Sequence, residues 1–164
     1  SDKYPDRLDS TGPNVIVTTA VTIMALNILY VPDFIKWKLG QNFKKFNTWP
    51  NGAGMINWHF AYWPPQLNVK VLPLEIKAMV KDKFEDLYTW LDANWQLAVP
   101  NGVSKETFMN AGYGIKRLRS MVNFMDKEDW SERLPELREW IQLIDKTRGT
   151  DFAKTFPELA VLIK

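Results

Sequence analysis

The stretch VIVTTAVTIMALNILYV, residues 15–31, sets the interpretation of the chain. Ten of its 17 residues are β-branched, and such side chains favour strands. Its first part, residues 14–24, is apolar on both faces, which is typical of a strand in a parallel sheet covered by helices. We therefore expect a buried strand over residues 14–24 that runs into a loop.

The same stretch also raises the alternative of a transmembrane helix, because no charged residue occurs between Asp9 and Asp33. Thr18, Thr22 and Asn27 argue against a membrane span, since their polar side chains would need partners in lipid. A Lys/Arg-rich segment of the kind that opens a signal peptide is also missing before the stretch. The sequence therefore predicts a cytoplasmic protein with no membrane partner.

The composition excludes several classes of function. The chain has 164 residues, which suggests one domain, and it contains no cysteine. A disulfide scaffold, a thiolate zinc site, a cysteine nucleophile and a self-ligated iron–sulfur cluster are thus excluded within this chain. With His59 as its single histidine, no metal site is expected. The net charge of +2 is too balanced to indicate a nucleic-acid partner.

Hydrophobic periodicity predicts strand–helix–strand–helix in the front half and helices alone in the back half. The expected elements are a short helix over residues 32–39, a second strand over 55–63, a short extended piece over 68–72, a helix from Pro73 to about Trp95, helices over 104–125 and 128–147, and a final helix broken at Pro157. Two strands are marginal on their own in water. We therefore expect further strands to precede residue 14.

Three segments resemble the C-terminal half of radical SAM enzymes of the twitch-domain group. Residues 22–34, TIMALNILYVPDF, resemble a strand-to-helix segment of that family, and residues 57–77, with Pro64-Pro65, resemble the family's next segment along the chain. The end, residues 143–159, resembles the family's closing segment. Together the three cover about residues 14–159. Proteins of this type are frequent in phage and bacterial genomes.

This resemblance implies an α/β fold, namely the C-terminal portion of a partial (β/α) barrel with two to three strands, followed by a helical extension. The corresponding boundaries are a leading loop over residues 1–13, a partial barrel segment over 14–100 and a helical extension over 101–164.

The resemblance further implies that S-adenosylmethionine and a [4Fe–4S] cluster serve a radical enzyme that acts on a peptide or protein substrate. The family's CxxxCxxC motif is absent here, so this chain would be inactive without a cluster-binding N-terminal part or a partner chain that supplies it. Met24 also stands where the family pattern has a small hydroxyl residue. The alternative is a non-catalytic interaction module, phage-derived, that binds another protein.

The candidate cofactor-binding residues are Thr22, Asn27, Asn57 and His59. Thr22 and Asn27 lie at the end of the first strand, where barrel enzymes collect polar groups. Asn57 and His59 alternate with the apolar side chains of the second strand, so they share one of its faces. Local hydrogen bonding for Thr22 and Asn27, and packing for His59, remain the alternatives. No catalytic residue is assigned.

Basic residues cluster at Lys116, Arg117 and Arg119, on the expected helix over residues 104–125. Such a cluster can contact phosphate or an acidic partner, but the default interpretation is a solvated helix face. The aromatic residues between Phe43 and Trp63 can stack bases or sugars, yet few Lys or Arg residues are interleaved with them. Packing is therefore the favoured interpretation of these aromatic residues.

Overall fold

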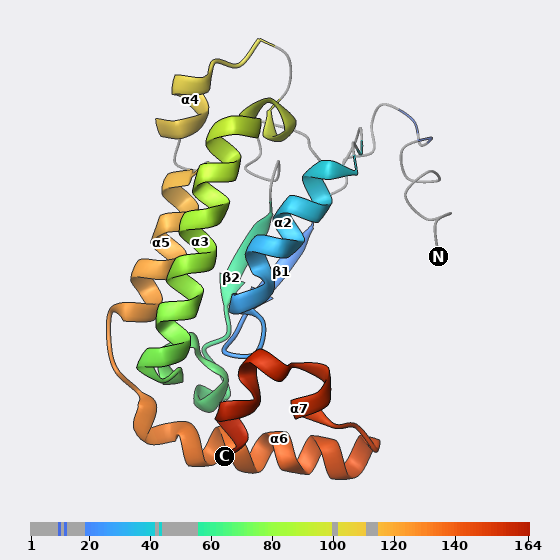
Figure 1. Ribbon diagram of the computed structural model, residues 1–164, viewed down its shortest axis with the longest axis vertical. Helices are drawn as coiled ribbons and strands as arrows, with labels where there is room; N and C mark the ends of the chain where they lie inside the picture. Colours follow the sequence, from blue (N-terminus) through green and yellow to red (C-terminus); the bar gives the residue numbers. More distant parts are fainter. Residues whose placement is uncertain are drawn as a thin grey trace.

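Two short strands pair in parallel at the centre of the protein (Figure 1). The structure is a computed structural model, and it describes residues 10, 12, 19–41, 43, 56–99, 102–110 and 115–164. Strand β1 (Ala20–Ile23) pairs with β2 (Asn57–Phe60), and Thr22 lies opposite His59. Because a helix lies between the two parallel neighbours along the chain, the pair is a β–α–β unit, and the predicted mixed α/β class is confirmed.

Both strands end earlier in the structure than the sequence predicts. Residues 14–18 of the first expected strand lie outside the described residues, so only its end can be compared. The second strand was expected to reach residue 63 but ends at Phe60. One further ladder bond follows, from the amide of Ala61 to the carbonyl of Ile23 at 2.8 Å. Beyond it the chain turns through Pro64 and Pro65, which have no N–H to donate.

The helices agree with the apolar periodicity of the sequence. Helix α2 (Val31–Gly40) extends the expected 32–39 by one residue at each end, and α3 (Leu74–Asn94) follows Pro73 as expected. The others are α4 (Lys105–Asn110), α5 (Ile115–Asp126), α6 (Leu134–Arg148) and α7 (Phe152–Thr155), with short 3₁₀ segments η1 (Ile28–Tyr30), η2 (Pro65–Leu67), η3 (Val69–Val71), η4 (Trp95–Ala98), η5 (Ser131–Arg133) and η6 (Pro157–Ile163). The single helix expected over residues 104–125 corresponds to α4 and α5, and residues 111–114 between them lie outside the described residues. The described part of the chain is mostly helical.

Two local predictions are wrong, and side chains that accept backbone hydrogen bonds explain both. The expected extended piece over residues 68–72 contains the 3₁₀ turn η3, because Asn68 accepts a hydrogen bond from the amide of Lys70 at 3.1 Å. The helix expected from Glu128 begins only at Leu134, since Asp129 accepts from the amide of Ser131 at 3.0 Å and holds a turn there. Such short-range bonds compete with regular structure.

Helices cover one face of the sheet and leave the other exposed. Val21, Ile23, Trp58 and Phe60 belong to the covered face, and the ring of Phe60 stacks on Phe124 of α5 at 3.9 Å. Helices α3 and α5 run side by side (Figure 1). One cluster of buried side chains includes residues on both sides of residue 100. The described residues before and after residue 100 thus share a core.

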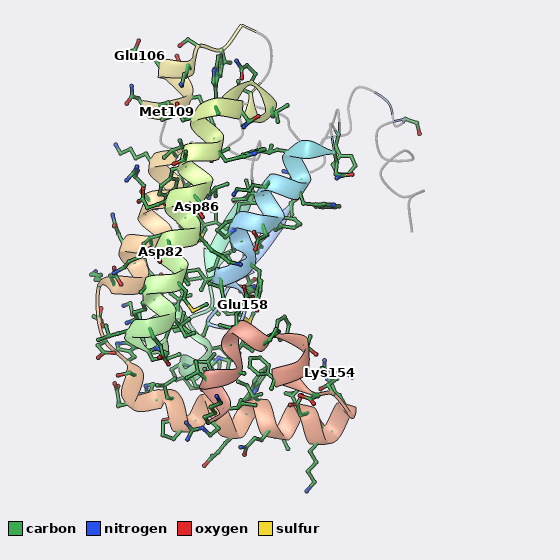
Figure 2. The ribbon with its side chains drawn as sticks, in the orientation of Figure 1. Asp82, Asp86, Glu106, Met109, Lys154 and Glu158 are labelled. Carbon is green, nitrogen blue, oxygen red and sulfur yellow. The ribbon has the colours of Figure 1, made fainter. Side chains whose placement is uncertain are left out.

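The C-terminal segment packs across one end of the protein. Helix α6 ends at Gly149, whose φ of 65° is the left-handed conformation that favours glycine. Segment η6 then lies against α6, and its Glu158 points toward α2 and α3 (Figure 2). Lys83 of α3 links η6 to α2, because its Nζ lies 2.9 Å from Asp33 of α2 and 3.4 Å from Glu158 of η6.

No helix in the described ranges combines the length and the apolar character that a membrane crossing needs.

Candidate functional site

The exposed face of the β1–β2 sheet carries polar side chains. Ala20 and Thr22 on β1 and Asn57 and His59 on β2 are all exposed, while the residues between them point into the covered face. The expected alternation of faces is therefore confirmed for β2. The expectation that the first strand is buried on both faces is wrong for its described part, because helices cover only the side of Val21 and Ile23 and leave Ala20 and Thr22 exposed. Because the register places Thr22 opposite His59 and Ala20 opposite Asn57, three of the four candidate residues share one small surface.

Thr22 and His59 interact directly on this face. The hydroxyl oxygen of Thr22 lies 3.3 Å from Nε2 of His59, and the ring tautomer decides which of the two donates. Both side chains are exposed, so each retains capacity for one more hydrogen bond. A hydroxyl and an imidazole so placed can bind the hydroxyl groups of a ribose or the polar groups of an amino acid.

Asn27 lies beyond the carboxyl end of β1, and its side chain forms hydrogen bonds with nearby backbone groups. Its Oδ1 accepts from the amide of Met24 at 2.9 Å, and its Nδ2 donates to the carbonyl of Thr22 at 2.9 Å. One amide N–H and one lone pair remain for a ligand. The geometry thus agrees with the alternative that Asn27 satisfies backbone groups at a strand end, and it makes Asn27 a residue that positions Thr22.

Arg117 adds a cation to the polar face, which the interpretation as a solvated helix face did not predict. Its guanidinium donates to Oδ1 of Asn57 at 3.3 Å and lies 5.3 Å from the ring centre of Trp58. A basic residue was visible in the sequence, but 60 positions separate Arg117 from Asn57. Only the packing of α5 against the sheet brings the two together.

Two aromatic residues lie exposed directly after β2. Tyr62 is 64% exposed and Trp63 is 84% exposed, whereas Trp58 and Phe60 of the same sequence run pack against the core. Packing is thus the correct interpretation for the strand itself, and the ring of Tyr62 still meets Phe124 edge-on at 5.8 Å. It is wrong for Trp63, and the aromatic residues between 44 and 55 lie outside the described residues. Since the carboxyl ends of parallel strands are where ligands collect in α/β folds, these rings border the candidate site.

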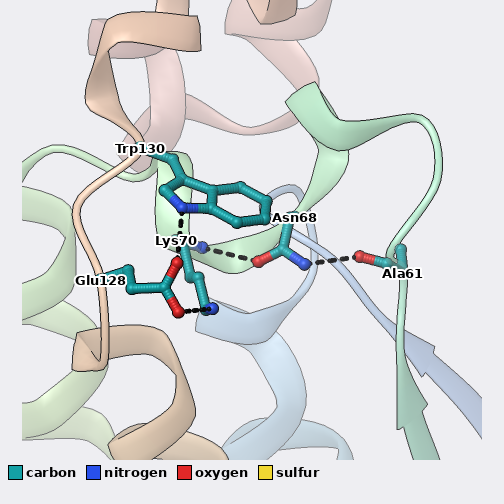
Figure 3. Close-up of polar contacts among 5 residues, drawn as sticks. All are labelled: Ala61, Asn68, Lys70, Glu128 and Trp130. Carbon is teal, nitrogen blue, oxygen red and sulfur yellow. Dashed lines mark hydrogen bonds and ion pairs between the residues drawn. The ribbon is translucent and has the colours of Figure 1, made fainter.

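A buried cation lies beneath this edge of the sheet (Figure 3). Lys70 is 5% exposed, and its Nζ lies 2.8 Å from Glu128, 4.6 Å from the ring centre of Phe124 and 4.8 Å from that of Trp130. Two hydrogen bonds lower the pKa of the Glu128 carboxyl. The larger effect comes from Lys70 and the next from the indole of Trp130. Every part of this cluster has a partner within it, so its role is to hold the α5–α6 connection on η3.

Lys38 of α2 is a second buried cation. Its pKa falls to about 8 because burial penalises the charged form. The described residues therefore contain three buried lysines, Lys38, Lys70 and Lys77. Helical periodicity gave no signal for Lys38 and Lys77, since a lysine on a helix is exposed by default, and Lys70 lies in the 3₁₀ turn η3 that the sequence did not predict.

Stability is expected to rise with pH through the titration of Lys38. The pKa is about 8 when folded and 10.5 when unfolded, so between these values the unfolded chain binds more protons and rising pH favours folding. Urea unfolding at about pH 7 and about pH 10 measures this. Relative to Lys38→Met, the wild type should gain stability at the higher pH. Relative to Lys36→Met, a variant on the same helix, the wild type should show no such gain. An equal gain against both variants would show that Lys38 is not the group responsible.

Comparison of the chain with models of protein families, with curated proteins and with solved structures finds no match. The site is therefore interpreted from its own geometry.

Proposed function

We propose that this chain is the cofactor- and substrate-facing C-terminal portion of a radical SAM enzyme built on a partial (β/α) barrel. A cluster-bearing N-terminal part, in the same protein or in a partner chain, completes it. The substrate is a peptide or protein. The observation that carries the proposal is the exposed polar face of a parallel strand pair whose other face is covered by helices.

The orientation of the faces supports this proposal. In a (β/α) barrel the helices form the outer ring and the opposite face of each strand points inward. Here α5 packs against Phe60 on the covered face, and Thr22 and His59 lie on the other. Further strands that complete the barrel would place Thr22, Asn57 and His59 inside it. Thr22 and His59 would then lie near the carboxyl ends of the strands, where barrel enzymes act, and Asn57 at the amino end of β2.

The chain supplies polar groups for S-adenosylmethionine but no ligands for the iron–sulfur cluster. The chain has no cysteine to hold a cluster, so the thiolates must come from elsewhere. When bound to the cluster, S-adenosylmethionine supplies a carbon radical that abstracts hydrogen from the substrate. Thr22 and His59 would hold polar groups of S-adenosylmethionine, and Asn27 would fix the backbone of Thr22. The exposed rings of Tyr62 and Trp63 would exclude water beside the substrate.

The test starts from the longest protein whose coding sequence includes this chain and a CxxxCxxC motif. After anaerobic reconstitution with iron and sulfide we expect broad visible absorption. After addition of a low-potential one-electron reductant we expect S-adenosylmethionine to be cleaved to methionine and 5′-deoxyadenosine. Residues 1–164 alone should show neither. If no such motif precedes the chain and no partner supplies one, the proposal is wrong.

Within that enzyme, Thr22→Val is expected to lower turnover of S-adenosylmethionine at least tenfold. The substitution keeps the β-branched shape that suits a strand and removes the hydroxyl that bonds His59. Thr89→Val is the matched control, because Thr89 is exposed on α3 and bonds only the carbonyl of Glu85. Thermal unfolding of both variants separates a lost contact from a lost fold. Equal activity of Thr22→Val and wild type would remove Thr22 from the site.

The second candidate function is a non-catalytic module that binds another protein. Exposed apolar side chains favour it, namely Trp63 and Tyr62 after β2 and Leu74 at the start of α3. A purified protein that stays colourless after reconstitution, and whose reading frame begins near Ser1, would replace the first candidate by this one.

A further inference from the structure

A cavity of about 210 Å³ lies between α6, α7 and the turn that follows β1. Its apolar wall consists of Leu26, Trp140, Ile141, Ile144, Phe152 and Phe156. We name it the C-terminal pocket. It opens to the surface and is separate from the exposed face of the sheet, although Leu26 lies next to Asn27 in the same turn.

The volume limits the occupant to one small group. Cavities that hold whole cofactors or drug-sized ligands have about 300–1,000 Å³, whereas an apolar cavity of about 150 Å³ is enough for benzene. The C-terminal pocket therefore has room for a single ring or branched side chain and not for S-adenosylmethionine.

The walls favour an aromatic ring. Phe152 and Phe156 lie 5.3 Å apart at 48°, and Trp140 adds a third ring. Tilted and edge-to-face contacts between aromatic rings at such separations contribute favourable free energy in addition to that of burial. An occupant with a ring can make this contact with three neighbours, which a branched aliphatic group cannot.

The polar residues at the rim are already engaged within the protein. Asp145 accepts from the hydroxyl of Thr150 at 2.7 Å and from the amide of Phe152 at 2.9 Å. The hydroxyl of Thr155 donates to the carbonyl of Asp151 at 2.8 Å. The pocket thus presents mainly rings and methyl groups to its occupant, and an anionic group would lose its hydration there beside the carboxylate of Asp145.

We infer that the C-terminal pocket binds the uncharged aromatic side chain of a peptide, in the manner of a phenylalanine ring. The inference is independent of the enzymatic proposal, since the pocket is formed within residues 26–156 whether or not a cluster-bearing part is present. A peptide bound there would pass the turn at the carboxyl end of β1.

The probe is N-acetylphenylalanine amide, added to the ¹⁵N-labelled chain of residues 1–164 and followed by amide chemical shifts. We expect saturable shifts in the millimolar range that centre on Thr150 and Phe152. N-acetylalanine amide, which lacks the ring, should cause none at these amides. Absence of saturation, or shifts centred elsewhere, overturns the inference.

Two neighbouring residues of α6 provide matched variants. Ile144→Trp fills the pocket and should weaken binding at least tenfold, whereas Leu143→Trp adds the same side chain at an exposed position outside it. The spectrum of each variant reports whether it is folded. If Ile144→Trp is unfolded, Thr155→Trp at the exposed rim replaces it. Binding to a folded, filled pocket with wild-type affinity overturns the inference.

Discussion

Phe84→Ala is expected to lower the free energy of unfolding by about 3–5 kcal/mol. Phe84 is 1% exposed at the middle of α3, within the cluster of buried residues shared by both halves of the chain. Its removal loses the transfer free energy of the ring, and the rigid helices around it leave a cavity. Since domains of this size are stable by about 5–15 kcal/mol, the loss is a large fraction of the total.

Urea unfolding measures this effect, and the exposed Asp86 provides the control. Asp86 lies two residues further along the same helix, so Asp86→Ala should change the free energy of unfolding by no more than about 0.5 kcal/mol. Thermal unfolding should show the same order, with a fall of about 2–4 °C for each kcal/mol lost. A loss below about 1.5 kcal/mol for Phe84→Ala would mean that α3 packs on the core more loosely than its burial indicates.

Periodicity predicted the long elements because packing obeys it. Ile76, Val80 and Phe84 recur at a spacing of four, and they form the buried stripe of α3. Asn57 and His59 alternate with Trp58 and Phe60, and each pair lies on its expected face. Where one face of an element is apolar and the other polar, the sequence determines which face is buried. This accounts for the correct prediction of the site's strands.

Short polar segments were not predicted, because single hydrogen bonds determine them. The carbonyl and amide groups bound by Asn68 lie seven residues before it and two after it, and no periodic pattern indicates such a pairing. The partners of Lys70 and Arg117 are more distant still, at separations of 58 and 60 residues. Their positions follow from the packing of α5, which the sequence analysis did not place against the sheet.

The four predicted site residues differ in how far local sequence determines them. Asn27 bonds groups within five residues, which is why a local role could be proposed from the sequence. Thr22 and His59 meet across 37 residues, so their contact depends on the register of the strands. The register in turn follows from burial of one face, since a shift by one residue would expose the apolar side chains.

Asn68→Leu is expected to lower the free energy of unfolding by about 2–4 kcal/mol. Asn68 is fully buried, and its Nδ2 donates to the carbonyl of Ala61 at 2.9 Å while its Oδ1 accepts from the amide of Lys70 at 3.1 Å (Figure 3). Leucine has a similar volume but no polar atoms, so a buried carbonyl and a buried amide would each lose a partner. The bridge from the end of β2 to η3 would be lost with them.

Urea unfolding of Asn68→Leu and Asn123→Leu tests this prediction. Asn123 is exposed on α5, so its substitution should change the free energy of unfolding by no more than about 0.5 kcal/mol. Asn68→Asp is a sharper variant, since it keeps an acceptor for the amide of Lys70 but places a buried carboxylate against the carbonyl of Ala61. It should be destabilising at pH 7 and less so as falling pH protonates the carboxyl. Wild-type stability of both Asn68 variants would show that the bridge contributes nothing.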